Sequence, residues 1–310
     1  MIYTVTLNPA LDREYSVDHL EKDEVLRASA VRVDFGGKGF NISRMLCFLG
    51  ESSVALGFVG GGTGKIIQNG LSAAGVKTSF TQVAGETRTD ISIVSEADKH
   101  YIKVNEPGPN ISTEEINRLL EQVDALIHSG DWWVLAGSLP PGVSDDIYAT
   151  IINRVQRNGA FAVLDASGPA LYQGVRAGPF LIKPNTKETS QLIAREVNSL
   201  PEMLDALPVL HGLGARLAMI SAGKDGALLS DGQKRWYCQA PKIQERNPIG
   251  AGDAMVAGLV WRLSQHDEIR NALAWAIACG TAAASQPGTA MPGRAVVEQF
   301  LKQIEVKEVK

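Results

Sequence analysis

Short apolar runs alternate along the chain with segments in which apolar residues recur about every three to four positions. Ser53–Val59 and Trp132–Ala136 have the composition of buried strands, and each precedes a segment with helical periodicity, 64–74 and 145–156 respectively. Further short strands are expected at Phe161–Asp165, 180–182 and 216–221. Because strands that alternate with helices pair in parallel, the pattern predicts an α/β fold whose mostly parallel sheet is covered on both faces.

Two stretches break this alternation, because strand-like segments follow one another there with no helix between them. One stretch contains 13–18 and 28–35, and the other contains 89–95 and 100–105, which form a hairpin across 96–99. Four strands joined by short links predict a small β-lid over one end of the main sheet. They are also compatible with an antiparallel edge of that same sheet, so both interpretations stay open at this point.

The segment 247–253 has the sequence NPIGAGD and is followed by a helical pattern. Glycines at 250 and 252 allow a tight turn, so the N–H groups of Gly250, Ala251 and Gly252 can face one point. The helix N-terminus adds a partial positive charge, which suits a transferring phosphoryl group. Asp253 lies beside this anion hole and is predicted to be the base that accepts the proton of an attacking hydroxyl. Taken alone, the segment is more typical of a turn in which an aspartate caps a helix.

A second glycine-rich segment, FGGKGFN at 35–41, opens another amphipathic helix. Gly37 lets a ligand approach the backbone closely, Lys38 offers a cation, and Asn41 offers an amide for sugar hydroxyls.

Two further segments are candidates for contacts with a nucleotide and its metal ion. SAGKDG at 221–226 follows a strand, and its glycines would admit a nucleotide against the backbone, although a plain β-turn is an equal alternative. KPNTKE at 183–188 leaves another strand, with Asn185 and Glu188 three residues apart at a helix start. These two side chains could hold a hydrated Mg²⁺ through water, or they could cap the helix.

Several other classes of protein find little support in the sequence. GGGTGK at 60–65 resembles a P-loop, but Val59 and Ile66 stand where that motif needs Gly and Ser or Thr. Neither glycine-rich segment completes GxGxxG, because Ile42 and Met255 replace the third glycine, so a nicotinamide-dependent oxidoreductase loses its main support. The net charge of −4 does not favour nucleic acid or an anionic membrane as a partner. Three widely spaced cysteines and a short apolar N-terminal run lead us to expect a cytoplasmic protein.

GGKGFN and NPIGAGD, in this order, resemble the two signatures of the ribokinase (PfkB-type) family of carbohydrate kinases. The resemblance extends from end to end of the chain. Four more segments look like the branch that acts on phosphorylated ketohexoses: TLNPALD at 6–12, GETRTD at 85–90, AGSLPPG at 136–142 and KPN at 183–185. Each motif is weak alone, but six of them in family order are specific.

This resemblance implies a ribokinase-like three-layer sandwich with a mostly parallel central sheet and a small β-clasp lid. It implies one kinase domain over 1–310, with the lid strands inserted at about 13–35 and 88–105. Lids of this family sometimes pair, so a homodimer is left open. ATP and Mg²⁺ are the expected cofactors.

The resemblance also implies roles for individual residues. The expected sugar-binding residues are Asp12, Gly37, Asn41 and Ser138. The residues expected to hold the substrate phosphate are Arg27, Lys38, Arg88 and Lys103. The nucleotide-side residues are Lys183, Asn185, Ser221, Gly223 and Gly226, and the anion hole and base are Gly250, Ala251, Gly252 and Asp253. The match is poor at 284–288, on the adenine side, and Thr189 and Ile249 depart from residues common in the branch.

The residues support a phosphorylated substrate independently of the resemblance. The chain is negative overall, yet the expected lid and its flanks carry Arg27, Lys38, Arg88 and Lys103. A dianionic phosphate would offset the repulsion between gathered cations, although each of them is also compatible with a solvated surface charge.

The expected reaction is transfer of the γ-phosphoryl group of ATP to fructose 1-phosphate, which gives fructose 1,6-bisphosphate. This substrate is the first choice because the opening at 1–12, GETRTD, and NEPGP at 105–109 look closest to the fructose-1-phosphate kinases. Tagatose-6-phosphate kinase is the second choice and 6-phosphofructokinase the third, because motif residues do not encode which end of the sugar carries the phosphate. A non-catalytic sugar-phosphate sensor is the alternative from a different class.

Overall fold

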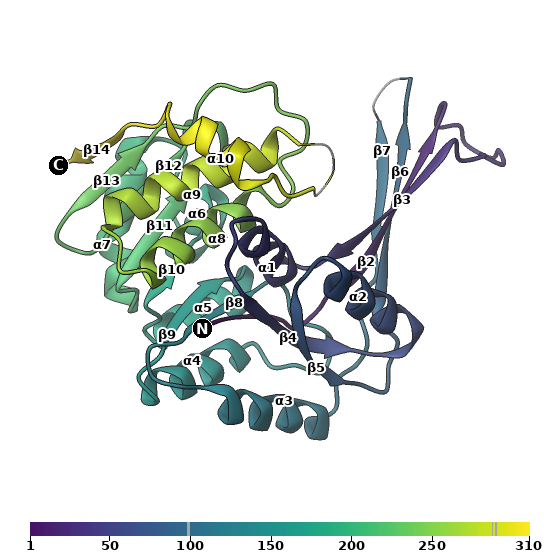
Figure 1. The fold of residues 1–310 in the computed structure, drawn as a ribbon, viewed down its shortest axis with the longest axis horizontal. Helices are drawn as coiled ribbons and strands as arrows, with labels where there is room; N and C mark the ends of the chain where they lie inside the picture. The colour runs from purple at the N-terminus through teal and green to yellow at the C-terminus, as the bar shows by residue number, and fades with distance from the viewer. Residues whose placement is uncertain (98–99, 287, 289) are drawn as a thin grey trace.

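The structure is a computed structural model that describes residues 1–97, 100–286, 288 and 290–310. In this part of the chain ten strands form one sheet (Figure 1), in the order β14-β13-β12-β11-β10-β9-β8-β1-β4-β5. Neighbours from β5 to β11 are parallel, whereas β12, β13 and β14 extend the sheet with antiparallel pairs. The strand bounds are Ile2–Thr6 (β1), Ser53–Val59 (β4), Lys77–Gln82 (β5), Trp132–Ala136 (β8), Phe161–Asp165 (β9), Leu181–Ile182 (β10), Leu217–Ser221 (β11), Ala227–Ser230 (β12), Arg235–Cys238 (β13) and Val306–Val309 (β14).

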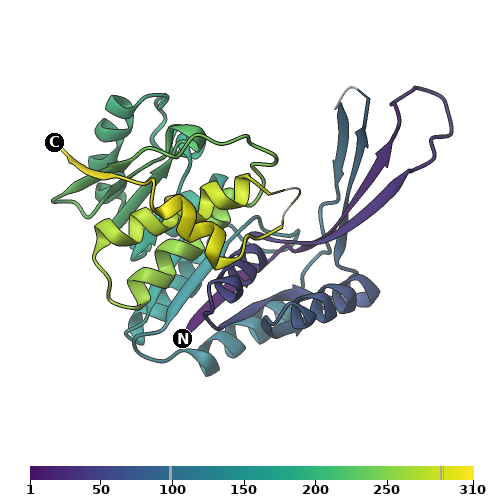
Figure 2. The ribbon, with the colours of Figure 1, turned by 45° about the horizontal axis from the view of Figure 1, so that its top comes forward.

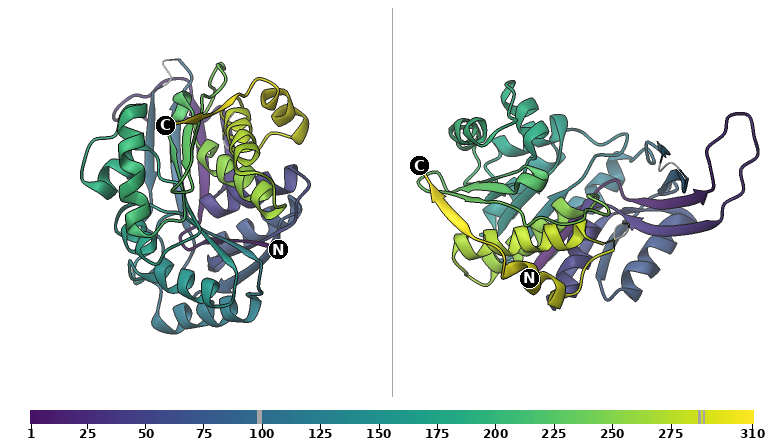
Figure 3. Two further views of the ribbon diagram at one scale, coloured as in Figure 1. Left: turned by 90° about the vertical axis from the view of Figure 1, so that its left-hand side faces the viewer. Right: turned by 90° about the horizontal axis from the view of Figure 1, so that it is seen from above.

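Helices cover both faces of this sheet, as the alternating pattern predicts. Their bounds are Lys38–Phe48 (α1), Gly61–Ala73 (α2), Thr113–Leu126 (α3), Ile147–Arg157 (α4), Gly168–Arg176 (α5), Thr186–Ile193 (α6), Leu200–Leu213 (α7), Ala251–Ser264 (α8), Ile269–Ala284 (α9) and Arg294–Leu301 (α10). One hydrophobic core joins the sheet to α1, α8, α9 and α10, and a second joins its other face to α3, α4, α5 and α7 (Figure 3). The predicted three-layer α/β sandwich is therefore confirmed. None of the described helices is long and apolar enough to cross a membrane.

The four strands that break the alternation form a second sheet of their own. Its order is β3-β2-β6-β7, with bounds Ala10–Val17 (β2), Ala30–Gly36 (β3), Arg88–Ser95 (β6) and Tyr101–Asn105 (β7). This sheet, called the lid below, projects from the body of the molecule (Figures 1 and 2). It is not an antiparallel edge of the main sheet. The expected β6–β7 connection at 96–99 includes residues 98–99, which lie outside the described residues.

The two faces of the lid have opposite character, because residues paired across strands share a face. Asp12 on β2 pairs with Asp34 on β3 and with Asp90 on β6, so three carboxylates line up on one face. On the opposite face, Val33 and Ile91 flank Arg13. The carboxylate row lies where β2, β3 and β6 join the body, and this junction is called the lid root below.

The main sheet prepares a site at the edge where its parallel strands end. β1, β8, β9, β10 and β11 all reach this edge with their carboxyl ends, and open α/β sheets bind ligands there. Helix α8 begins at the same edge, directly after Gly250.

Candidate active site

A cavity of about 1060 Å³ is lined by residues of the carboxyl edge of the main sheet and of the lid root. This volume is at the upper end of the range for small-molecule sites, so it has room for two small ligands. Most of the residues that the sequence predicts line it: Asp12, Gly37, Lys38, Asn41, Arg88, Lys103, Ser138, Lys183, Asn185, Ser221, Gly223, Gly250, Ala251, Gly252 and Asp253. We call the part around Lys38, Asn41, Asp165, Lys183 and 250–253 the sheet end, and the part around Asp12, Arg88, Asp90 and Lys103 the lid end.

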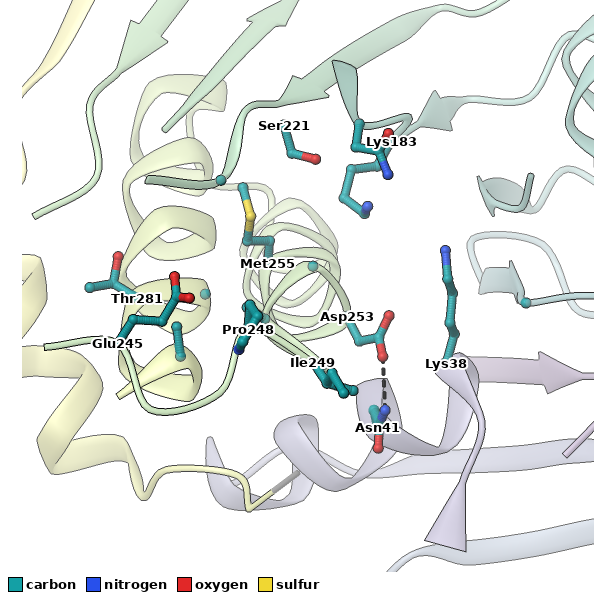
Figure 4. Close-up of a pocket in the computed structure, with 18 of the residues that line it drawn as sticks. Lys38, Asn41, Lys183, Ser221, Glu245, Pro248, Ile249, Asp253, Met255 and Thr281 are labelled. Atoms are coloured by element: carbon teal, nitrogen blue, oxygen red, sulfur yellow. Dashed lines mark hydrogen bonds between the residues drawn. The ribbon is translucent and has the colours of Figure 1, made fainter. Parts of the chain in front are cut away.

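Asp253 occupies the first turn of α8 and is buried against the cavity. The turn before it depends on Gly250, whose φ of 82° lies in the left-handed region that favours glycine. Asn41 Nδ2 donates a hydrogen bond to Asp253 Oδ2 at 2.8 Å (Figure 4). A side chain at Gly252 would have its Cβ 3.3 Å from Lys183 Nζ, so the glycine lets an ammonium group approach the helix N-terminus. The two glycine-rich segments therefore meet at one carboxylate, as the sequence predicts for a base beside an anion hole.

The environment of Asp253 brings the pKa of its carboxyl close to neutral pH. Burial, and then the charge of Asp165, raise the pKa of Asp253 to about 6. Lys38, Asn41 and Lys183 act in the opposite direction. The carboxylate is thus ionised at pH 7 but remains a stronger base than an exposed aspartate.

Lys38 and Lys183 share one fully buried carboxylate, that of Asp165 at the end of β9. Lys38 Nζ lies 2.9 Å from Asp165 Oδ1, and Lys183 Nζ lies 3.3 Å from Asp165 Oδ2. Burial alone would raise the pKa of Asp165, but the two ammonium groups outweigh it and hold that pKa below its ordinary value. Glu188 Oε1 lies 4.0 Å from Lys38 Nζ on another side. Lys38 therefore contacts the sheet end of the cavity.

The lid end contains a second set of charges, carried by β2, β6 and β7. Arg88 Nη1 donates to the backbone oxygen of Glu106 at 2.9 Å and lies 3.5 Å from Asp90 Oδ1. Arg88 Nε is buried and has no hydrogen-bond partner in the structure, so this donor is available to a ligand. Burial raises the pKa of Asp12 to about 6, with Lys103 acting against it and Asp90 acting in support.

Asn185 and Glu188 form a capping box at the start of α6. Glu188 N donates to Asn185 Oδ1 at 2.8 Å, and Asn185 N donates to Glu188 Oε2 at 2.9 Å. In the described part of the chain no group of three or more His, Cys, Asp or Glu side chains is arranged to hold a metal ion directly. Glu188 keeps one oxygen outside the cap, on the side of Lys38, which fits a contact through water better than direct ligation.

Three predicted residues do not line this cavity: Glu188, whose Oε1 lies 4.0 Å from Lys38 Nζ, Arg27 and Gly226. Arg27 is exposed on the loop between β2 and β3, at the end of the lid that is remote from the root. Gly226 has a φ of 91°, and a Cβ there would lie 1.9 Å from Cys238 O. It therefore lets β13 pass closely rather than lining the cavity.

Sequence reasoning did not single out Asp165, Asp90, Thr6 or Asn8. All but Asp165 line the cavity, and Asp165 lies directly behind Lys38 and Lys183. Among the described residues, the buried atoms Thr6 Oγ1 and Asn8 Oδ1 have no hydrogen-bond partner, which marks them as further contacts for a polar ligand. A usable signal existed for Asp165, because a carboxylate ends the otherwise apolar strand 161–165.

The poorly matching C-terminal region also contributes to the cavity. Met255, Gly280, Thr281 and Ala284 line it on the side away from the lid, together with the stretch 239–243. Residues 287 and 289 of the segment 284–288 lie outside the described residues. A Cβ at Gly280 would lie 2.5 Å from Met255 Cγ, so this glycine lets Met255 pack closely at the cavity wall.

Comparison with known proteins agrees with this geometry. The model of the pfkB family carbohydrate kinases matches residues 6–294. The chain is 34% identical over 314 residues to the tagatose-6-phosphate kinase of Staphylococcus epidermidis, and the match covers 100% of both proteins. It is 35% identical over 310 residues to the 1-phosphofructokinase of Bacillus subtilis, covering 100% of this chain and 99% of that protein.

Solved structures lead to the same group of proteins. Phosphofructokinase-2 from Escherichia coli in complex with potassium superposes with a TM-score of 0.92 at 29% identity, covering 97% of this chain and 98% of that one. The tetrameric inhibited form of the same enzyme gives a TM-score of 0.90 at 28% identity, with the same coverage.

Proposed function

The chain belongs to the pfkB family of carbohydrate kinases, and we propose that it phosphorylates a ketohexose phosphate with ATP. The most specific form of the proposal is that fructose 1-phosphate becomes fructose 1,6-bisphosphate. The free thiols of Cys47, Cys238 and Cys279 are compatible with the reducing cytoplasm, where we place this activity.

The observation that carries the proposal is the position of Asp253 in the first turn of α8. Asn41 donates a hydrogen bond to Asp253 Oδ2, which leaves Asp253 Oδ1 to accept a proton from the attacking hydroxyl. The N–H groups of 250–252 begin the same helix, so negative charge on the transferring group meets the positive end of the helix dipole. The base thus acts on the attacking hydroxyl, and the anion hole acts on the phosphoryl group to which its oxygen bonds.

The cofactor residues are proposed from their position on the nucleotide side. Lys183, Asn185, Ser221 and Gly223 line the sheet end of the cavity and would contact ATP. Asn185 and Glu188 would hold Mg²⁺ through its water ligands. When bound, the metal neutralises charge on the β- and γ-phosphate oxygens.

The substrate phosphate is assigned to the lid end. Arg88 and Lys103 offer cations there, and Arg88 has an unpaired buried N–H. Glu106 fixes this arginine through its backbone oxygen, and its carboxylate accepts from Thr89 N at 2.8 Å. Glu106 belongs to NEPGP, a segment that favours fructose 1-phosphate by its resemblance to the kinases for that sugar. Asp12 at the lid end, Asn41 at the sheet end and Ser138 line the same cavity and are proposed to hold the sugar hydroxyls.

A coupled assay of ADP release tests the proposal with three substrates: fructose 1-phosphate, fructose 6-phosphate and tagatose 6-phosphate. We expect the highest kcat/KM with fructose 1-phosphate. A higher kcat/KM with tagatose 6-phosphate would make the second choice correct. Binding of a sugar phosphate without any ADP release would contradict the kinase assignment and favour a sensor.

We also propose a homodimer that pairs two lids. The apolar face of the lid is exposed at Val31, Val33, Ile91, Ile102 and Val104, with exposed fractions of 56%, 43%, 36%, 52% and 57%. An unpaired apolar sheet face of this kind is typical of an interface. A second chain packed on it could also bring its own Arg27 toward the cavity, which one chain does not do.

Two measurements test the dimer. Sedimentation equilibrium should show a dimer for the wild type and a monomer for the double variant Val31→Asp, Val104→Asp. The control Val209→Asp changes an exposed valine on α7 and should leave the dimer intact. Mixing Arg27→Ala with Asp253→Asn should restore activity if Arg27 serves the partner's cavity, because one heterodimer site is then complete. If subunits of the two variants exchange and activity is not restored, Arg27 does not contribute to the partner's cavity.

A further inference from the structure

Lys38 contacts a different end of the cavity from the one that its sequence context suggests. Its segment, GGKGFN, suggests a cation for the substrate phosphate, alongside Arg88 and Lys103. In the structure its ammonium group contacts Asp165 at 2.9 Å and approaches Glu188 at 4.0 Å. Asp165, Asp253 and Glu188 are also the groups whose charges act on Lys38, and all three belong to the sheet end or the start of α6.

Lys183 reaches the same place from the opposite side. It follows β10, and its side chain, which is 5% exposed, lies over the first turn of α8. Figure 4 shows the ends of Lys38 and Lys183 pointing toward the same region, above Asp253 and Asn41. Two cations from segments far apart in the sequence therefore flank the helix N-terminus that forms the anion hole.

Asp165 holds this arrangement together. Its side chain is 0% exposed, and each of its two oxygens faces one ammonium group. Oδ2 has no hydrogen-bond partner in the described part of the chain, so Lys183 is held chiefly by charge. Asp165 faces each ammonium group with a single oxygen, so both groups keep N–H donors for a further acceptor. These donors, beside the N-terminus of α8, favour an anion between the lysines.

We propose that Lys38 and Lys183 together bind the transferring γ-phosphoryl group, and that Asp165 is the positioning residue that holds both lysines. This proposal rests on the proposed kinase function and deepens it. In the reaction, the bond from the γ-phosphorus to the bridging oxygen of ATP breaks, and a bond forms to the sugar hydroxyl oxygen. ADP leaves with the bonding pair, and the hydroxyl proton goes to Asp253. Negative charge on the γ-phosphoryl oxygens meets two ammonium groups that need no reorganisation.

The competing assignment is that Lys38 binds the phosphate already on the sugar. The two assignments predict opposite losses on Lys38→Met, a change that keeps an unbranched side chain one atom shorter and removes its charge. Lys38 is 33% exposed, so the variant should fold. Binding is measured by calorimetry for three ligands in the presence of Mg²⁺: the non-hydrolysable imido analogue of ATP, ADP, and the best sugar phosphate from the substrate screen.

We expect Lys38→Met to lower the preference for imido-ATP over ADP by about tenfold, which corresponds to about 1.4 kcal/mol. Affinity for the sugar phosphate should stay unchanged. The kcat should fall by about 10²–10³-fold, the usual loss for one donor to a transition-state anion. A tenfold loss of sugar-phosphate affinity with an unchanged nucleotide preference would overturn the proposal and return Lys38 to the lid end.

Asp165→Asn tests the positioning role, with Asp131→Asn as a matched control. Asp131 is also a buried carboxylate, and it pairs with the N-terminal amine at 3.0 Å, away from the cavity. Asp165→Asn should lower the imido-ATP preference as Lys38→Met does, and the double variant should lose less than the sum. Asp131→Asn should keep wild-type preference and kcat. An additive double variant, or Asp165→Asn with wild-type preference, would overturn the positioning role.

Failure of this inference can be told apart from failure of the kinase assignment. A wild-type protein that phosphorylates no ketohexose phosphate would defeat the kinase assignment. An active wild type whose Lys38→Met variant keeps both nucleotide preference and kcat would defeat the two-lysine proposal alone.

Discussion

At the sheet end of the cavity two lysines share the carboxylate of Asp165, whereas at the lid end three carboxylates stand side by side. Asp34, Asp12 and Asp90 are paired across neighbouring strands, an arrangement in which like charges destabilise a sheet. The sheet end is built from buried strand ends and a helix N-terminus, and its charges compensate one another. The lid end is built from strands that are exposed on their other face.

The difference indicates a division of labour between the two ends. The sheet end is organised before any ligand binds, as a site that stabilises a transition state must be. The lid end keeps two groups that lack full partners among the described residues. Arg88 Nε has no hydrogen-bond acceptor, and burial raises the pKa of the Asp12 carboxyl. A sugar phosphate would satisfy both, because its phosphate accepts and its hydroxyls donate. Recognition is thus expected to depend on the lid and chemistry on the sheet.

The largest effect is expected at the sheet end. Asp253→Asn removes the proposed base but keeps the shape and the contact with Asn41, so kcat should fall by about 10²–10⁴-fold. Sugar-phosphate affinity should change little. Steady-state kinetics and calorimetry measure the two quantities, and a variant with wild-type kcat would show that another group takes the proton.

Arg88→Ala should have the next largest effect, and it should be confined to the lid end. We expect the fall in kcat/KM for the sugar phosphate to correspond to a loss of about 2–4 kcal/mol in transition-state stabilisation, because a buried charged partner of the phosphate is lost. The dissociation constant of ATP should barely change. Arg88→Lys should rescue poorly, since an ammonium group lacks the planar fork of the arginine.

The control for this change is Arg118→Ala, which also removes an arginine bonded to a backbone oxygen, that of Gln82. It should leave both constants at wild-type values. Equal losses for sugar phosphate and ATP in Arg88→Ala would place this arginine in the fold rather than at the substrate.

Glu188→Gln probes the metal at the sheet end. Glutamine also completes a capping box, so α6 should keep its start while the charge is lost. We expect the Mg²⁺ concentration for half-maximal rate to rise by about 10–100-fold, the usual effect of losing an outer-shell partner. Glu202→Gln makes the same change in the capping box of α7 and should have no effect. If the Mg²⁺ titration of Glu188→Gln matches that of the wild type, Glu188 serves only as a cap of α6.

The smallest effect concerns stability at the lid end. Burial raises the pKa of Asp12 to about 6 in the folded protein, above its unfolded value. Protonation therefore stabilises the fold at low pH, and this stabilisation is lost as pH rises through 6. Asp12→Asn should raise the stability of the ligand-free protein by about 1–2 kcal/mol at pH 8, with little gain at pH 4.

Thermal unfolding at the two pH values measures this difference, with Asp124→Asn as an exposed control. The same Asp12 variant should bind the sugar phosphate more weakly. A variant that is less stable than the wild type at pH 8 would show that the carboxylate row is compensated by contacts within the fold.

Much of this organisation could be predicted from the sequence. NPIGAGD specified the turn, the helix start and Asp253, because glycines and a following helical pattern leave few other conformations. The two pairs of strand patterns predicted a lid, although they were also compatible with an antiparallel edge of the main sheet, and their bounds shifted by a few residues.

The rest depended on where side chains point and how far strands reach. Lys38 begins α1, and the carboxylates of Asp165, Asp253 and Glu188 draw its ammonium group to the sheet end. Arg27 lies just before β3, and Arg88 begins β6. Strand β6 starts at the lid root, but β2 and β3 run antiparallel, so β3 begins at the remote end of the lid. Asn185 and Glu188 fitted a cap and a metal contact equally well, and the cap is present.

The most direct test of the account follows the transferred phosphoryl group itself. Phosphorus NMR of a reaction with ATP, Mg²⁺ and fructose 1-phosphate should show fructose 1,6-bisphosphate appearing in step with ADP, and both appearing about 10²–10⁴-fold more slowly with Asp253→Asn. Formation of ADP and free phosphate without a bisphosphate, from this substrate or from the two 6-phosphates, would contradict the account.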